Sequence, residues 1–263
     1  MIGLQAAGPI EQFEIIPIVP LAVGEFDLSF TNSSLWMLIG FVAVIAFFLA
    51  ATRSRALVPG RLQSMAEILH QFISDLVRVT IGDEGRKFFP YVFTLFIFIL
   101  VANFFGLIPT PPGAPHELHV FTTTSHLVVT FALAMLTIMI VIVYGLLKNG
   151  WKFFKLFAPS GLPIWLMPLL VPIEIVSFLS RPFSLAIRLF ANMFAGHIIL
   201  KLFAGFVASM LAAGGFVAVL GIAPFLGAIA VTALELLVAA LQAYVFAILT
   251  CIYLSDAAHA SDH

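Results

Sequence analysis

Polar and charged side chains recur on one face of an otherwise apolar segment in the C-terminal half of the chain. They follow one another at intervals of three or four residues: Glu174, Ser177, Arg181, Ser184, Arg188 and Asn192. On an α-helix this spacing places them on a single stripe. An arginine at the centre of a membrane helix costs about 2.5 to 3.5 kcal/mol, so it normally faces a bundle interior or a water-filled cavity. If the segment lies in a membrane, the stripe predicts a functional site.

Three more polar residues lie outside this stripe, and His197 serves a different surface of the helix from Arg188. His197 follows Arg188 by nine residues, which on a helix turns it by about 180° and displaces it by about 13 Å. Glu235 and Gln242 share one face of a later apolar segment, and an antiparallel hairpin could bring Glu235 close to His197. A buried histidine and a buried carboxylate can relay protons, because both can titrate near neutral pH. Arginine stays protonated, so Arg188 predicts a fixed positive charge.

The composition excludes a soluble globular protein. Hydrophobic residues make up 62% of the 263 residues and charged residues 10%, whereas a typical globular domain has about 45 to 50% and about 25%. The 12 Lys and Arg against 13 Asp and Glu leave no basic excess for a nucleic-acid partner. Cys251 is the only cysteine, which excludes an intrachain disulfide and a cysteine-rich metal site.

Five apolar segments are long enough to be membrane helices. They are residues 35–51, 88–108, 127–147, 172–212 and 224–254. A bilayer core of about 30 Å needs roughly 17 to 25 helical residues, and barrel strands would instead alternate apolar and polar residues. The sequence therefore predicts an all-α integral membrane protein with about five membrane helices. The last two segments exceed an upright crossing and predict a hairpin of two long, strongly tilted helices.

Other local signals refine this prediction. Residues 62–81 mix apolar and charged side chains, as expected for an amphipathic helix at the inner membrane interface. Pro182 is a candidate kink in the first long helix. Gly214 and Gly215, together with residues 221–224, predict the turn of the hairpin.

The basic residues sort to one side of the membrane. Between the first two spans, and directly after the third, lie Arg53, Arg55, Arg61, Arg78, Arg86, Lys87, Lys148, Lys152 and Lys155. The first 52 residues and residues 109–126 contain neither Lys nor Arg. By the positive-inside rule the N-terminus lies on the outer side and the C-terminus in the cytoplasm. Because no basic region precedes the first apolar run, we expect that run to remain as an anchor.

Four stretches of the chain resemble one protein family. SRPFSLAIRLFANMFAGHII (180–199) and LELLVAALQAYVFAILTCIYLS (234–255) are similar to subunit a of the membrane sector of F-type ATP synthases. NFFGLIP (103–109) and VPGRLQSMAEIL (58–69) resemble the corresponding upstream regions. The likeness extends from about residue 35 to the end. It implies an outer N-terminal arm (1–34), anchoring helices with an inner amphipathic helix (35–157), and an ion-translocating hairpin with an inner tail (158–263).

The resemblance also implies roles for the polar residues. Arg188 would be the essential cation that faces the ion-binding carboxylate of a rotating ring of c subunits. The outer half-channel would be lined by Asn192, His197, Glu235 and Gln242. The inner half-channel would include Glu174, Ser177 and Ser184. Some family members carry the acid at the position of His197 and the histidine at that of Glu235, which suggests that the two act as a pair.

The implied protein is a stator that couples proton flow to ATP synthesis without binding nucleotide. A proton enters from outside, neutralises a ring carboxylate, travels with the ring and leaves through the inner half-channel. Expected partners are the c-subunit ring, the b-type subunits of the peripheral stalk, other ATP synthase subunits and lipid; no cofactor or metal is expected. A bacterial inner membrane is the expected location. The His/Glu pair favours protons, whereas selection of sodium would be set by the ring.

Other interpretations remain at this stage. Arg188 could form a structural ion pair with Glu174 or Glu235, and Arg181 could anchor the inner side or pair with Glu174. Asn103 could bridge helices or belong to the outer channel. Three outer-loop histidines have poor metal-site spacing: His116, His119 and His126. A secondary ion-coupled transporter would need a midplane site and usually internal repeats, and a purely structural subunit would not need these buried charges.

Overall fold

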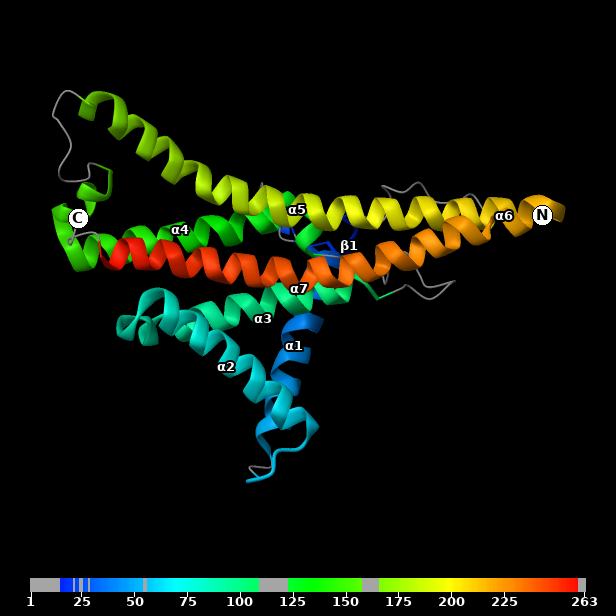
Figure 1. Ribbon diagram of the computed structural model, residues 1–263, viewed down its shortest axis with the longest axis horizontal. Coiled ribbons are helices and arrows are strands. Elements are labelled where there is room, and N and C mark those ends of the chain that lie inside the picture. Colours follow the sequence, from blue (N-terminus) through cyan, green and yellow to red (C-terminus); the bar gives the residue numbers. More distant parts are fainter. Residues whose placement is uncertain are drawn as a thin grey trace. The chain divides into compact units, whose positions relative to one another are not determined.

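The computed structural model describes residues 15–20, 22–23, 26–27, 29–53, 56–108, 123–157 and 166–259. Within these residues the chain is almost entirely helical (Figure 1). Its main helices are α1 (Asn32–Arg53), α2 (Arg61–Ile81), α3 (Phe89–Gly106), α4 (Leu127–Asn149), α5 (Met167–Ala213), α6 (Gly215–Leu220) and α7 (Ile222–Ala258). Short 3₁₀ helices are η2 (Asp83–Lys87), η4 (Thr123–Ser125) and η5 (Gly150–Phe157). The all-α prediction is confirmed.

Five helical segments in the described part of the chain are long and apolar enough to cross a membrane. They are Asn32–Arg53, Phe89–Gly106, Leu127–Phe153, Met167–Ala213 and Gly215–Ala258. The helix α5 has 47 residues, so at 1.5 Å per residue its helical path is about 70 Å long. It continues through Pro172 and Pro182, so the prolines do not divide it.

The N-terminal arm contains short strands that the sequence analysis did not predict. β1 (Pro17–Val19) pairs antiparallel with β4 (Phe30–Thr31), and β2 (Ala22–Val23) pairs antiparallel with β3 (Phe26–Asp27). Asn32 joins this arm to the start of α1, because its Oδ1 accepts hydrogen bonds from the backbone N–H groups of Ile16 and Ser33. Strands of two or three residues are too short to show an alternating pattern.

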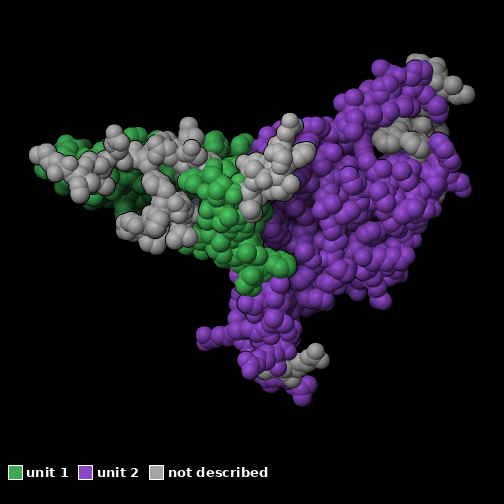
Figure 2. All heavy atoms as spheres, turned by 180° about the vertical axis from the view of Figure 1, so that it is seen from behind, with its two compact units in different colours: residues 1–42, 100–126, 189–242 green, residues 43–99, 127–188, 243–263 purple. Residues whose placement is uncertain are grey.

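The chain forms two compact units, which Figure 2 colours separately. Unit 1 comprises residues 1–42, 100–126 and 189–242, and unit 2 comprises residues 43–99, 127–188 and 243–263. Four long helices therefore contribute one part to each unit: α1, α3, α5 and α7. The division falls directly after Arg188 on α5 and directly after Gln242 on α7.

Unit 1 contains an antiparallel hairpin formed by the end of α5, by α6 and by the first part of α7. Gly214 and Gly215 make the turn with φ angles of 69° and 59°, a left-handed conformation that glycine adopts at little cost. The predicted turn at 221–224 is not a reversal, because Gly221 is right-handed helical and Pro224 lies in the first turn of α7. A Cβ on Gly227 would lie 3.0 Å from the Phe203 ring, so the helices pack closely.

Unit 2 packs α2, α3 and α4 around a common core. The buried residues of α2 are Ala66, Ile73, Val77 and Ile81, whose spacing defines one helical face and agrees with the amphipathic prediction. Between α3 and α4, the hydroxyl groups of Tyr91 and Thr137 are 2.8 Å apart. Because α2 buries only this face, its other side remains exposed.

Candidate functional site

Arg188 lies on α5 in unit 2 with an exposed side chain. Leu189, the next residue, is buried, as are Leu185 and Ala186 one turn earlier. The two ion pairs seen among the described residues are Lys148–Glu84 and Arg181–Asp256, and neither includes Arg188. Within the described part of unit 2, Arg188 makes no ion pair with Glu174. The permanently charged guanidinium of Arg188 is therefore exposed on the surface of an apolar helix.

The residues of the predicted inner pathway lie on the turns of α5 that precede Arg188. Glu174 is half-buried, whereas Ser177 and Ser184 are exposed. With Arg188 they continue the stripe that the spacing predicts. All four belong to unit 2.

Arg181 differs from Arg188 because it has an acidic partner in its own chain. Its Nη1 lies 3.1 Å from Oδ2 of Asp256 on α7. The guanidinium also lies over the rings of Phe178 and Tyr253, at 5.4 and 5.0 Å from their centroids. The sequence allowed a pairing of Arg181 with Glu174, but the partner in the structure is Asp256. Asp256 could not be paired with Arg181 from the sequence, because 75 positions separate the two residues.

In unit 1, three of the four polar residues predicted for the outer pathway are buried, whereas Asn192 is exposed. The exposed fractions are 9% for His197, 6% for Glu235 and 3% for Gln242. Asn192 Nδ2 donates a hydrogen bond to Gln242 Oε1 at 3.2 Å. The hairpin thus brings together two residues that are 50 positions apart, as an antiparallel arrangement predicts.

The carboxylate of Glu235 packs against the backbone of Gly196, the residue before His197. A Cβ on Gly196 would collide with Oε1 of Glu235 and would lie 2.8 Å from its Cδ. The register of the hairpin therefore brings Glu235 to the level of His197. Gly196 was not singled out from the sequence, although a glycine inside a long helix beside a buried histidine is a signal of close approach.

Two polar atoms of this group are buried without a hydrogen-bond partner in the described chain: Oε2 of Glu235 and Nε2 of Gln242. Most buried polar groups in proteins are hydrogen-bonded, and exceptions often mark functional sites. Both atoms can exchange hydrogen bonds with water or with a proton carrier.

Asn103 joins three elements of unit 1. Its Nδ2 donates to the Ala239 carbonyl of α7 at 3.2 Å, and its Oδ1 accepts a 2.7 Å hydrogen bond from Thr124 in η4. Ala239 lies on α7 between Glu235 and Gln242. Of the two sequence interpretations, bridging between helices is the one that the structure shows.

The outer-loop histidines are described only in part. His116 and His119 lie outside the described residues, as does Arg55 of the basic cluster. His126 precedes α4, and burial lowers the pKa of its imidazole from the ordinary value. Among the described residues no group of three His, Cys, Asp or Glu side chains is arranged to hold a metal ion.

The fold and these residues define a multi-pass α-helical membrane protein with polar residues buried in a helical hairpin. The model of the family described as "ATP synthase A chain" matches residues 34–255. Proteins named ATP synthase subunit a are similar over nearly the whole length. That of Maricaulis maris is 59% identical, covering 95% of this chain and 97% of its own, and that of Hyphomonas neptunium is 56% identical, covering 98% of each.

The chain belongs to the ATP synthase A chain family. The resemblance to subunit a of the F-type ATP synthase membrane sector is thereby confirmed. The chain is a membrane subunit associated with ATP synthesis and ion transport, and it is a non-catalytic part of its complex.

Proposed function

We propose that this chain is the proton-conducting stator of an F-type ATP synthase, working against a ring of c subunits. The observation that carries the proposal is Arg188, an exposed arginine on an apolar helix that has no acidic partner among the described residues of its own unit. Its charge needs a counterpart, because an unpaired cation is costly in a membrane. A carboxylate on a rotating neighbour would supply one.

The role of Arg188 follows from its chemistry. Guanidinium cannot deprotonate at any relevant pH, so it blocks proton passage and favours the ionised form of a carboxylate that approaches it. A protonated ring carboxylate is neutral and can rotate into lipid. When it reaches Arg188 it releases its proton and passes the arginine as an anion. Ions then cross only by moving with the ring.

The outer half-channel would contain the buried polar group of unit 1. Asn192 and Gln242 form one hydrogen-bonded pair, and Glu235 lies at the level of His197. Protons from the outer compartment would pass along His197 and Glu235 to the ring. The orphaned polar atoms of Glu235 and Gln242 supply sites for this exchange.

The inner half-channel would use the stripe of unit 2, which carries Glu174, Ser177 and Ser184.

The membrane potential would drive proton flow with about 2.3 kcal/mol per elementary charge per 100 mV. Protons leave on the side that holds the basic residues, which is the cytoplasm of a bacterium if the positive-inside rule applies. Partners are then the c-ring, the b-type peripheral-stalk subunits and the remaining subunits of the complex.

The test is the pair of variants Arg188→Ala and Arg181→Ala in the assembled complex in inverted membrane vesicles. Arg188→Ala should abolish proton-driven ATP synthesis while the complex still assembles, because the fixed charge is lost. Arg181→Ala is the matched control on the same helix, and it should lower stability but keep coupling. Coupled synthesis at the normal rate in Arg188→Ala would refute the proposal.

A further inference from the structure

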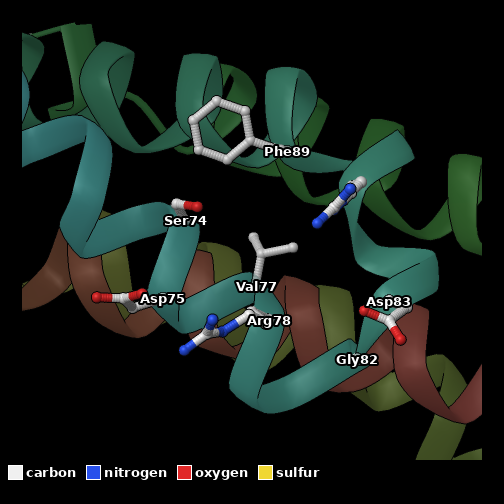
Figure 3. A pocket seen from close by; sticks show the side chains of 8 residues that line it. Ser74, Asp75, Val77, Arg78, Gly82, Asp83 and Phe89 are labelled. Atoms are coloured by element: carbon white, nitrogen blue, oxygen red, sulfur yellow. The ribbon is translucent and has the colours of Figure 1, made fainter.

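The C-terminal end of α2 and the following η2 line an open cavity of about 320 Å³ in unit 2 (Figure 3). Four charged side chains line it, two of each sign: Asp75, Arg78, Asp83 and Arg86. Phe89, the first residue of α3, forms an apolar part of the wall. Cavities that bind small molecules have volumes of about 300 to 1,000 Å³, so this cavity can hold a small polar group.

The walls of this cavity are held by tight contacts. Gly82 has a φ of 83° and donates its N–H to the Arg78 carbonyl at 3.0 Å, which turns the chain back toward α2. A Cβ on Gly85 would lie 2.7 Å from Val77, so η2 packs directly on the helix. The backbone that carries Asp75 and Arg78 on α2 is thereby held close to the backbone that carries Asp83 and Arg86 on η2.

A second element fixes η2 from the other side. Glu84 accepts hydrogen bonds from Lys148 and Tyr144 of α4. The hydrogen bond from Lys148 and, to a smaller extent, the one from Tyr144 hold the pKa of the Glu84 carboxyl below its ordinary value. Glu84 therefore anchors η2 to α4. It is not one of the four charged residues that line the cavity.

The four charged side chains of the cavity make no ion pair with any described residue. Asp75 and Arg78 are three residues apart on α2, a spacing at which opposite charges can pair, yet they do not. All four are exposed. Two arginines and two aspartates that are not paired with each other fit a ligand that carries both a positive and a negative charge.

The surroundings of the cavity point to a lipid. The helix α2 connects two membrane-spanning helices, so it lies at a membrane surface. It also exposes large apolar side chains, among them Ile68 and Val79 at 66% and 82% exposure. Apolar side chains exposed on an amphipathic helix insert at the level of lipid headgroups. Phe89 begins the span of α3, which continues the apolar surface from the cavity toward the acyl chains.

We propose that this cavity binds the headgroup of a zwitterionic phospholipid that carries a phosphate and a primary ammonium, as phosphatidylethanolamine does. Arg78 and Arg86 would bind the phosphate oxygens, for which the planar guanidinium has matching geometry. Asp75 and Asp83 would accept hydrogen bonds from the ammonium. Phe89 would contact the glycerol and the start of an acyl chain.

The chemistry separates this ligand from other lipids. An anionic headgroup without an amine would satisfy the arginines but would face two carboxylates of like charge. A choline headgroup has no N–H donor for the carboxylates. A charged protein segment would match the four side chains but would leave the apolar side chains around them uncovered.

The test uses the intact purified ATP synthase complex, delipidated in mild detergent and then supplied with phosphatidylethanolamine, phosphatidylcholine, phosphatidylglycerol or inorganic phosphate. Native mass spectrometry counts the lipid retained. Arg78→Gln with Arg86→Gln should weaken retention of phosphatidylethanolamine by about tenfold or more, since each charge-assisted hydrogen bond lost costs a substantial part of the affinity. The control Arg61→Gln, on the same helix outside the cavity, should retain the lipid.

The carboxylates provide a second measurement. Asp75→Asn with Asp83→Asn should keep phospholipid binding but remove the preference for phosphatidylethanolamine over phosphatidylcholine. Equal retention in the double arginine variant and the wild type would overturn the proposal. Inorganic phosphate that displaces the lipid at equal concentration would show a free-phosphate site instead. Loss of a peripheral-stalk subunit with lipid unchanged would show a protein ligand instead.

Discussion

At the scale of single residues, Gly196 provides the space that the Glu235 carboxylate occupies. Any larger residue at this position would meet Oε1 and Cδ of Glu235. A carboxylate in a proposed proton path must keep its position within a fraction of an ångström, since proton transfer needs heavy atoms within hydrogen-bond distance. A residue without ionisable groups thereby becomes part of the site.

Gly196→Ala should reduce proton-driven ATP synthesis by about tenfold, because overpacking by one methyl group costs about 1 to 3 kcal/mol and displaces Glu235. Gly205→Ala is the matched control on the same helix, where an added Cβ has no neighbour within 4 Å. Initial rates of synthesis in inverted vesicles measure both. Equal rates in the two variants would show that Glu235 does not depend on this space.

The His197 and Glu235 side chains should act as a pair. His197→Glu and Glu235→His, made singly, should each slow proton passage without uncoupling it. The double exchange should restore part of the flux, because one acid and one imidazole are again present at the same level of the hairpin. Proton flux through each variant complex in vesicles is the measurement. Unchanged flux in both single variants would end the idea of a relay, and purely additive losses would show that the two side chains act independently.

At the scale of elements, ion pairs outside the membrane core fix short segments against long helices. Glu84 ties η2 to α4 through Lys148 and Tyr144. The sequence places these residues 60 and 64 positions apart, and nothing in local periodicity joins them. Only the packing of η2 against α4 brings them together.

The Glu84 contribution to stability should depend on pH in one direction. The hydrogen bond from Lys148 lowers the Glu84 pKa from 4.5 in the folded chain, so the stabilisation is fully present above pH 4.5 and is lost as the pH falls through the lower folded-state value. Thermal unfolding of the complex at several pH values from about 7 to about 3.5 measures this. The difference between wild type and Glu84→Gln should shrink toward the acid end. A constant difference would contradict the role of the ionised carboxylate.

At the scale of the whole molecule, periodicity and composition were enough to predict the helices. Each predicted helix overlaps an observed one closely: the span 127–147 overlaps α4 (Leu127–Asn149), and the amphipathic helix 62–81 overlaps α2 (Arg61–Ile81). The stripe from Glu174 to Arg188 also follows from helical spacing alone. The contacts between distant segments could not be predicted in detail, because partners such as Arg181–Asp256 and Glu235–Gly196 depend on the register of α5 and α7. Hairpin register depends on packing at many small residues rather than on any one motif.

The orientation in the membrane can be tested with single cysteines, after the buried Cys251 is replaced by alanine. Leu57 between α1 and α2 is 105% exposed, and Ile108 after α3 is 48% exposed. If the positive-inside rule sets the topology, a membrane-impermeant maleimide should label Leu57→Cys and His259→Cys from the cytoplasmic side and Ile108→Cys from the outer side. Comparing right-side-out with inverted vesicles separates these cases. Labelling of Leu57→Cys and Ile108→Cys from the same side would mean that α3 does not cross the membrane. The distribution of basic residues between the loops would then not reflect the topology.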